Sequence, residues 1–179
     1  MIQVLVILAE GFEEIEAVTL IDVLRRAGVE VVSASLGDTR VRGAHAVTIE
    51  ADCRLDEVIA QTFDAVVLPG GMPGSKNLRD DPRVLECLQR QQKEGRFLGA
   101  LCAAPIVLEA AGVLKGKRAT CYPGYELPSA QQIDERVVRD GKIVTSRGPG
   151  TALEFALEWV RILVSADKAA QLREGMIVQ

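Results

Sequence analysis

Short apolar segments alternate with longer segments of helical periodicity along the whole chain, and this alternation constrains the fold more than any other feature. The first such segment, IQVLVIL (2–8), is an almost continuous apolar run, as is typical of a strand covered on both faces. Residues 13–27 follow with apolar residues on one helical face, and Gly28 ends that helix. Repeated units of this kind predict a mostly parallel, doubly wound α/β sheet.

The remaining segments continue the same pattern. Further strands are predicted at 29–35, 64–71, 96–101 and 118–122, with a strand pair at 136–146 and a short hairpin within 37–52. Further helices are predicted at 82–94 and 104–111, from Pro149 through residue 164, and at 166–175. Sheets of this class bind ligands at the carboxyl ends of their strands, so we expect the functional site there.

Composition limits the class of protein. The chain has 179 residues, 48% of them hydrophobic, which suits one domain spanning residues 1–179. Its net charge is -4 with acids and bases mixed, so we expect no nucleic-acid partner. The first eleven residues lack the basic region and cleavage site of a signal sequence, and no apolar run approaches the ~18 residues of a membrane span. We therefore expect a cytoplasmic protein without a membrane partner.

The four cysteines are far apart in the chain. They have no CxxC spacing and no clustered histidines, so reduced thiols are expected rather than a disulfide framework or a metal site. Cys102 differs from the others because it lies where the strand at 96–101 turns into the helix at 104–111. Small residues flank it, as a tight nucleophile elbow requires, and a helix N-terminus favours a thiolate. The alternative is a buried structural cysteine, which is the commoner case.

A glycine-rich turn, LPGGMPG (68–74), ends another strand at the same sheet edge. Backbone amides from Gly70 or Gly71, together with that of Ala103, are candidates for an oxyanion or substrate-binding site. A glycine turn that only ends a strand is an equally simple interpretation. The turn is not a phosphate-binding loop, because no Gly-Lys-Ser/Thr follows it.

Carboxyl groups gather in the first turn of the helix at 13–27. Acids at this position are ordinary partners of the helix dipole, which is sufficient for most of them. Glu16 borders the buried face, where a desolvated carboxyl holds a proton and hydrogen-bonds a thiolate. The spacing alone does not choose Glu16 over Glu13.

Two other features have simpler explanations. His45 is the sole histidine and lies in the hairpin region, where a surface or interface position is expected. The residue after Cys102 is Ala103, so no adjacent histidine serves as the base of a protease. The turn SRGPGT (146–151) precedes a helix and can bind an anion there, but its turn chemistry favours a structural role.

Four blocks, LAEGFEEIEAVTLIDVLRRAG, VVLPGG, GALCAAP and TSRGPGT, resemble in order and spacing the ThiJ/PfpI superfamily, within it the branch of the Parkinsonism-associated protein deglycase. The resemblance implies a flavodoxin-like sandwich and a homodimer whose interface includes the first helix and Arg26. It implies that Cys102 is the nucleophile and that Glu16 is a protonated carboxyl on its sulfur. The amides of Gly71 and Ala103 would face the substrate oxygen, and no cofactor would be needed.

The same resemblance implies conversion of methylglyoxal and glyoxal to hydroxy acids, disputed deglycation, and protection against oxidative stress. Some relatives have a histidine where Tyr122 stands here, and we expect Tyr122 to be a substrate-binding residue. A neutral tyrosine is a poor base near pH 7. The neighbouring Cys121 is either a second oxidisable thiol or a buried strand residue. The alternatives are a redox sensor or holdase chaperone signalling through Cys102, and a hydrolase or hydratase of small amides or isonitriles.

Overall fold

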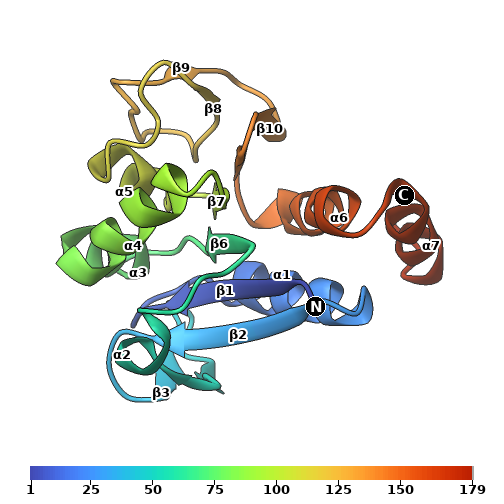
Figure 1. Ribbon diagram of the computed structural model, residues 1–179, viewed down its shortest axis with the longest axis horizontal. Helices are drawn as coiled ribbons and strands as arrows, with labels where there is room; N and C mark the ends of the chain where they lie inside the picture. The colour runs from blue at the N-terminus through green and yellow to red at the C-terminus, as the bar shows by residue number, and fades with distance from the viewer. Residues whose placement is uncertain (179) are drawn as a thin grey trace.

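Seven strands form the central sheet of the computed structural model, which describes residues 1–178 (Figure 1). In spatial order they are β10 (Val137–Asp140), β11 (Ile143–Ser146), β7 (Phe97–Leu101), β6 (Ala65–Leu68), β1 (Gln3–Leu8), β2 (Glu30–Ser35) and β5 (Cys53–Arg54). Neighbouring strands are parallel, except for β10 and β11, which pair antiparallel. The mostly parallel sheet predicted from the alternating pattern is confirmed.

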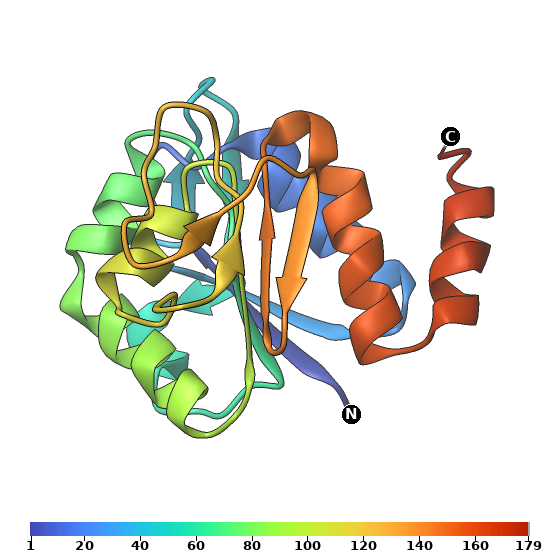
Figure 2. The same cartoon turned by 90° about the horizontal axis from the view of Figure 1, so that it is seen from above.

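Helices cover both faces of this sheet (Figure 2). On one face lie α1 (Glu14–Arg26) and α6 (Ala152–Leu163), with α7 (Ala166–Gly175) packed outside α6. On the other face lie α2 (Leu55–Val58), α3 (Gly74–Asp80), α4 (Pro82–Lys93) and α5 (Pro105–Ala110). This is the doubly wound sandwich that the sequence predicts.

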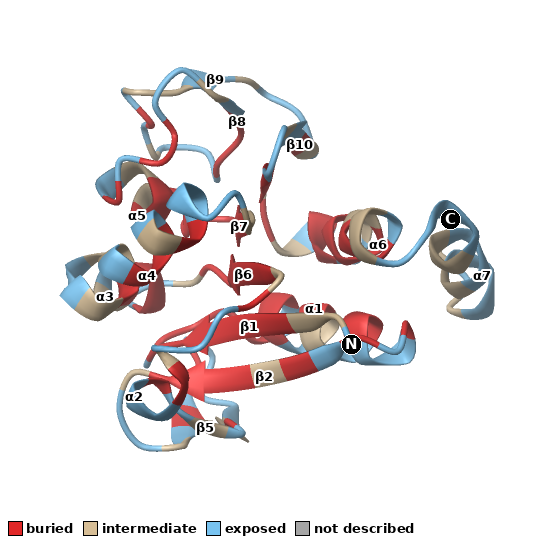
Figure 3. Ribbon diagram, in the orientation of Figure 1, coloured by how far each residue is buried: buried red, intermediate tan, exposed pale blue. Residues whose placement is uncertain are grey.

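The central strand β1 shows why two layers are needed. Its side chains alternate between the faces, and Leu5 and Ile7 join the core beneath α4 and α5. Val4, Val6 and Leu8 join the core beneath α1 and α6. All five are fully buried, and Figure 3 shows β1 and β6 as buried segments. A strand this apolar on both sides is stable only between two helical layers.

The hairpin predicted within 37–52 is present as β3 (Arg40–Arg42) and β4 (Thr48–Glu50), paired antiparallel. The strand predicted at 118–122 is wrong in extent. Only β8 (Arg118–Ala119) is extended, and it pairs with β9 (Gln131–Gln132) outside the central sheet. The reason is that β10 already occupies the edge of β11, so the chain after β8 turns toward the end of β7 instead.

Five elements were not predicted from the sequence, and two of them are the short strands β5 and β9. The short helices α2 and α3 lack an extended apolar stripe, and a single 3-10 turn, η1 (Pro149–Thr151), precedes α6, which therefore begins later than expected. Within residues 1–178, no helix has the length and apolar character needed to cross a membrane.

Candidate active site

Cys102 occupies a sharp turn between β7 and α5. Its φ is +59°, a left-handed conformation that is uncommon for a residue with a side chain. Its N–H donates to the carbonyl of Ser146 at 2.9 Å, and its own carbonyl accepts the N–H of Tyr122 at 2.8 Å. Backbone hydrogen bonds from two other segments therefore hold the elbow in this conformation.

The glycine turn after β6 lies directly against this elbow. A Cβ added at Gly70 would lie 2.6 Å from the Cβ of Cys102 and 2.8 Å from Oε2 of Glu16. Such distances are not tolerated between carbon and heavy atoms, so only glycine allows the approach. The predicted convergence of the strand ends of β1, β6 and β7 is thus present.

Glu16 reaches this point from the first turn of α1 and is fully buried. Its Oε2 accepts the N–H of Gly70 at 2.7 Å, while its Oε1 has no hydrogen-bond partner among residues 1–178. Glu13 plays a different part, because it caps the helix and accepts the N–H of Glu16 at 2.8 Å. The tertiary contacts therefore separate two acids that the sequence left equivalent.

The buried carboxyl and thiol perturb each other. Burial raises the pKa of Glu16 to about 7, against the opposing effects of the N–H of Gly70 and of the neighbouring Cys102 thiol. Burial, followed by the adjacent charge of Glu16, raises the pKa of Cys102 to about 12. The two acids compete for one negative charge, and the first proton leaves from the carboxyl, near neutral pH.

These values correct one expectation from the sequence. The elbow was expected to hold an open thiol that ionises more readily than a free one. Cys102 is instead only 7% exposed, and its pKa is raised because desolvation outweighs the helix N-terminus. The acid poised near neutral pH is Glu16.

The predicted pair of amides lies at the sulfur. The backbone N–H groups of Gly71 and Ala103 both lower the pKa of the Cys102 thiol. Gly71 has a φ of +90°, and a Cβ there would overlap the backbone of Glu13. The two donors are thus fixed by tightly packed backbone, as a site for developing negative charge requires.

The segment after β8 also contacts the elbow. The side chain of Tyr122 is 45% exposed, and its ring stands edge-on to that of Tyr125. Substrate binding by Tyr122 stays a prediction. The preceding residue, Cys121, is buried, and its thiol donates to the carbonyl of Cys102 at 3.1 Å. This contact was not predicted, because only the fold brings the two residues together.

His45 lies on the surface and is held by Glu14. Its Nδ1 is 2.9 Å from Oε2 of Glu14, a hydrogen bond that raises the pKa of His45. Its backbone N–H donates to Oε1 of Glu14 at 2.7 Å, and the N–H of Val47 reaches the same oxygen. Both oxygens of Glu14 are occupied, so this group fastens the hairpin to α1.

The turn at 146–151 is closed by its own side chains. The hydroxyls of Ser146 and Thr151 lie 2.6 Å apart, and Oγ1 of Thr151 also accepts the N–H of Gly148 at 3.1 Å. These bonds support the structural role expected from the sequence.

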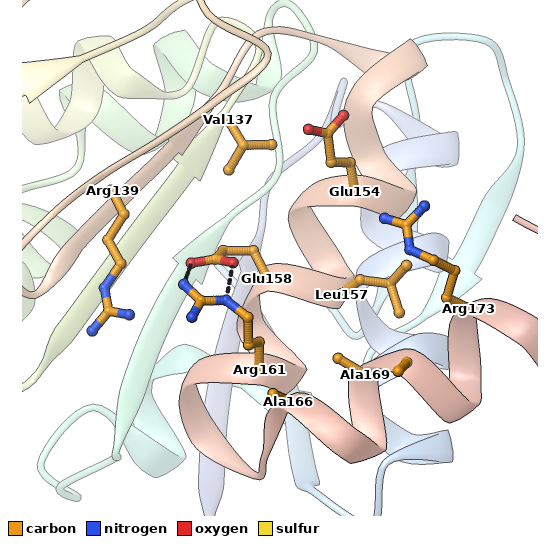
Figure 4. A pocket seen from close by; sticks show the side chains of 10 residues that line it. Val137, Arg139, Glu154, Leu157, Glu158, Arg161, Ala166, Ala169 and Arg173 are labelled. Carbon is orange, nitrogen blue, oxygen red and sulfur yellow. Dashed lines mark hydrogen bonds and ion pairs between the residues drawn. The ribbon is translucent and has the colours of Figure 1, made fainter. Parts of the chain in front are cut away.

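A groove of about 500 Å³ lies elsewhere, between β10, α6 and α7 (Figure 4). Its walls include alanines of α7, and Arg161 makes two hydrogen bonds with Glu158 on one side of it. None of the predicted site residues lines this groove, so the groove is not part of the candidate active site.

Comparison with known proteins places the chain in a family. The sequence profile of the DJ-1/PfpI family matches residues 2–162. Protein dj-1beta of Drosophila melanogaster is 42% identical over 97% of this chain and 96% of its own length. The crystal structure of Drosophila melanogaster DJ-1beta superposes with a TM-score of 0.97 at 41% identity, covering 99% of this chain and 98% of that one.

Three further relatives differ in length or in name. Protein DJ-1 homolog B of Arabidopsis thaliana is 42% identical over 98% of this chain, but the chain spans only 41% of that protein's length. Protein DJ-1 homolog A of the same plant is 41% identical over 98% of this chain, which spans 46% of its length. A Caenorhabditis elegans relative named glutathione-independent glyoxalase DJR-1.2 is 38% identical over 91% of this chain and 89% of its own length. The chain therefore belongs to the DJ-1/PfpI family.

Proposed function

We propose that the protein converts small reactive carbonyls, such as methylglyoxal and glyoxal, to hydroxy acids through Cys102 and Glu16. The observation that carries this proposal is a buried carboxyl, its pKa raised to about 7, beside a thiol that two backbone amides face. The relative named glutathione-independent glyoxalase supports the same class of reaction. Removal of such carbonyls or their early adducts would protect a cell against carbonyl and oxidative stress.

The first step is addition of the thiol to the aldehyde. The carboxylate of Glu16 accepts the thiol proton while the sulfur of Cys102 bonds to the aldehyde carbon. The carbonyl electron pair moves to oxygen, which the N–H groups of Gly71 and Ala103 face. Glu16 then passes the thiol proton to this oxygen, which gives the neutral hemithioacetal and restores the carboxylate. Because the pKa of the thiol lies above that of the carboxyl, the transfer of the thiol proton to Glu16 is uphill until the S–C bond forms, and we expect modest turnover.

The second step moves a proton between neighbouring carbons. Glu16 removes the proton from the carbon bonded to sulfur and returns it to the adjacent carbon, while the hydroxyl proton passes from the first oxygen to the second. The carbon bonded to sulfur is thereby oxidised and the adjacent carbon is reduced. The resulting thioester is hydrolysed by water, which releases the hydroxy acid and the free thiol. The two redox changes cancel within the substrate, so no external oxidant is consumed.

Two alternative functions use the same thiol. A redox sensor or holdase calls for an accessible thiol of low pKa, whereas Cys102 is nearly buried with a raised pKa. Selective oxidation of Cys102 by mild peroxide without carbonyl turnover would favour that alternative. No specific contact among residues 1–178 favours the alternative of a hydrolase of small amides or isonitriles.

The test compares two variants with the wild-type protein. We expect Cys102→Ser and Glu16→Ala each to abolish lactate formation from methylglyoxal, because one removes the nucleophile and the other the proton carrier. Lactate is measured after incubation with methylglyoxal, and circular dichroism establishes that each variant is folded.

The matched control is Cys53→Ser, which alters a free cysteine in β5. It should keep wild-type activity. Unchanged lactate formation in either site variant would overturn the assigned roles.

We also infer a homodimer through α1. Ile15 and Val18 are 58% and 48% exposed on this helix, and Val47, between β3 and β4, is 53% exposed. The N–H groups of His45 and Val47 donate to Glu14, so the hairpin is fastened to the first turn of α1, next to Ile15. Association of two such surfaces would remove them from water.

A further inference from the structure

The carbonyl oxygen of Cys102 accepts two hydrogen bonds from one neighbouring segment. The N–H of Tyr122 donates at 2.8 Å, and the thiol of Cys121 donates at 3.1 Å. A carbonyl oxygen has two lone pairs, so these donors satisfy it fully. Nothing in the proposed reaction uses Cys121.

This carbonyl belongs to the peptide group that stabilises the sulfur. The C=O of Cys102 and the N–H of Ala103 are the two ends of one planar peptide unit. That N–H is one of the two backbone donors that lower the pKa of the Cys102 thiol. Donors on the oxygen both fix the plane of this unit and polarise its N–H, which makes the N–H a stronger donor.

We propose that Cys121 is a positioning residue: its thiol holds and polarises the Cys102–Ala103 peptide group, and thereby stabilises the charged sulfur of Cys102. The inference rests on the proposed role of Cys102 as the reactive thiol. Cys121 itself does not react with substrate.

The surroundings of Cys121 suit a donor and not a nucleophile. It is buried, and burial raises the pKa of its thiol to about 12, so the S–H proton is present at neutral pH. The titratable and charged groups around the two thiols are Glu16 and Glu13 on α1, and Asp134 and Arg147, which share a small cavity with Cys121. All of them are retained in the variants described below.

The test uses two variants of equal shape. Cys121→Val removes the donor, whereas Cys121→Thr keeps a hydroxyl donor on a side chain of the same branching. The rate of alkylation of Cys102 by iodoacetamide is followed by peptide mass spectrometry from pH 6 to 11. We expect Cys121→Val to move the pH profile upward by about one unit, equivalent to about tenfold slower alkylation at pH 8.

Rescue by the conservative variant separates positioning from simple packing. Cys121→Thr should react within about twofold of wild type, because a neutral hydrogen bond to the same carbonyl is retained. If methylglyoxal is turned over, Cys121→Val should lower kcat and leave KM unchanged, since the substrate does not touch residue 121. If Cys121→Val does not fold, Cys121→Ala and Cys121→Ser form the equivalent pair.

Three results would overturn the inference. They are a profile of Cys121→Val that overlays the wild type, a Cys121→Thr variant as slow as Cys121→Val, and a wild-type Cys102 that resists alkylation up to pH 11. Only the last would also contradict the proposed function. Alkylation needs no carbonyl substrate, so absence of methylglyoxal turnover would refute the proposed function and leave this test intact.

Discussion

At the residue scale, Glu16 combines a cost in stability with a chemical use. The carboxyl is fully buried and accepts a hydrogen bond from Gly70, yet its pKa is raised to about 7 by desolvation. A group whose pKa is higher in the folded than in the unfolded state binds its proton more tightly when folded. The contribution of Glu16 to stability is therefore greatest below its unfolded pKa of 4.5 and is lost as the pH rises through about 7.

Substitution of this carboxyl by an amide tests that sign. We expect Glu16→Gln to keep the acceptor for Gly70 and to remove the ionisation, so the variant becomes more stable than wild type as the pH rises. The shift from 4.5 to about 7 corresponds to a relative gain of about 3 kcal/mol between pH 4.5 and 8. Urea unfolding of both proteins across this range measures the difference.

The control is Glu10→Gln, which alters an exposed acid in the turn that follows β1. Its stability relative to wild type should change little over the same range. A constant difference between Glu16→Gln and wild type at all pH values would contradict the raised pKa.

At the element scale, the site depends on how closely the loop after β6 approaches the end of β7. Gly70 is in contact distance of both Cys102 and Glu16, so this loop sets the space between thiol and carboxyl. Gly71 adds a positive φ that turns its N–H toward the sulfur. The strand ends supply position, and these two glycines allow the final approach.

A single methyl group should disrupt this arrangement. Gly70→Ala would place a Cβ 2.6 Å from the Cβ of Cys102 and 2.7 Å from the carbonyl oxygen of Leu101. We expect the free energy of unfolding to fall by about 1–3 kcal/mol, as is usual for overpacking. We also expect Cys102 to be alkylated more slowly than in the wild-type protein. Thermal unfolding and the alkylation assay measure the two effects.

Gly37→Ala provides the comparison, because a Cβ at Gly37 meets nothing within 4 Å. This variant should keep wild-type alkylation. Equal behaviour of the two glycine variants would show that the close approach does not matter.

At the scale of the whole molecule, α1 serves two parts of the protein. Its first turn carries Glu16 into the site, while Ile15 and Val18 face outward. A dimer through this helix would hold its N-terminus between the sheet and a second subunit. The geometry of the site would then depend on assembly.

The inferred homodimer predicts a specific effect of surface charge. The double variant Ile15→Lys and Val18→Lys should sediment as a monomer, because four lysines would meet across the symmetric interface. Leu153→Lys, at an exposed apolar position on α6, should remain dimeric like the wild type. A monomeric wild-type protein at micromolar concentration, or a dimeric double variant, would contradict the assignment of this surface.

Much of the architecture follows from local sequence. The apolar run at 2–8 predicts a strand covered on both faces, and the apolar stripe at 13–27 predicts a helix buried on one side. These two patterns specify β1 and α1 with little ambiguity. The segment 118–122 carries an equally good strand pattern, but β10 has already taken the adjacent sheet edge, so only its first residues are extended. Competition for one edge is a property of the assembled sheet.

The site divides in the same way. Small residues around position 102 predict the elbow, because a tight turn excludes large side chains from its neighbours. The sequence does not distinguish Glu16 from Glu13, because the hydrogen bond that does so joins Glu16 to Gly70, 54 residues away. It likewise gives no sign that Cys121 reaches the carbonyl of Cys102.

The sequence by itself determined the alternation of strands and helices, the two covered faces of the sheet and the position of the elbow, because each depends on neighbouring residues along the chain. Only the tertiary structure decided which acid meets the thiol and which group ionises near neutral pH. Desolvation by distant segments sets the pKa values of Glu16 and Cys102, and it overcomes the local effect of the helix N-terminus.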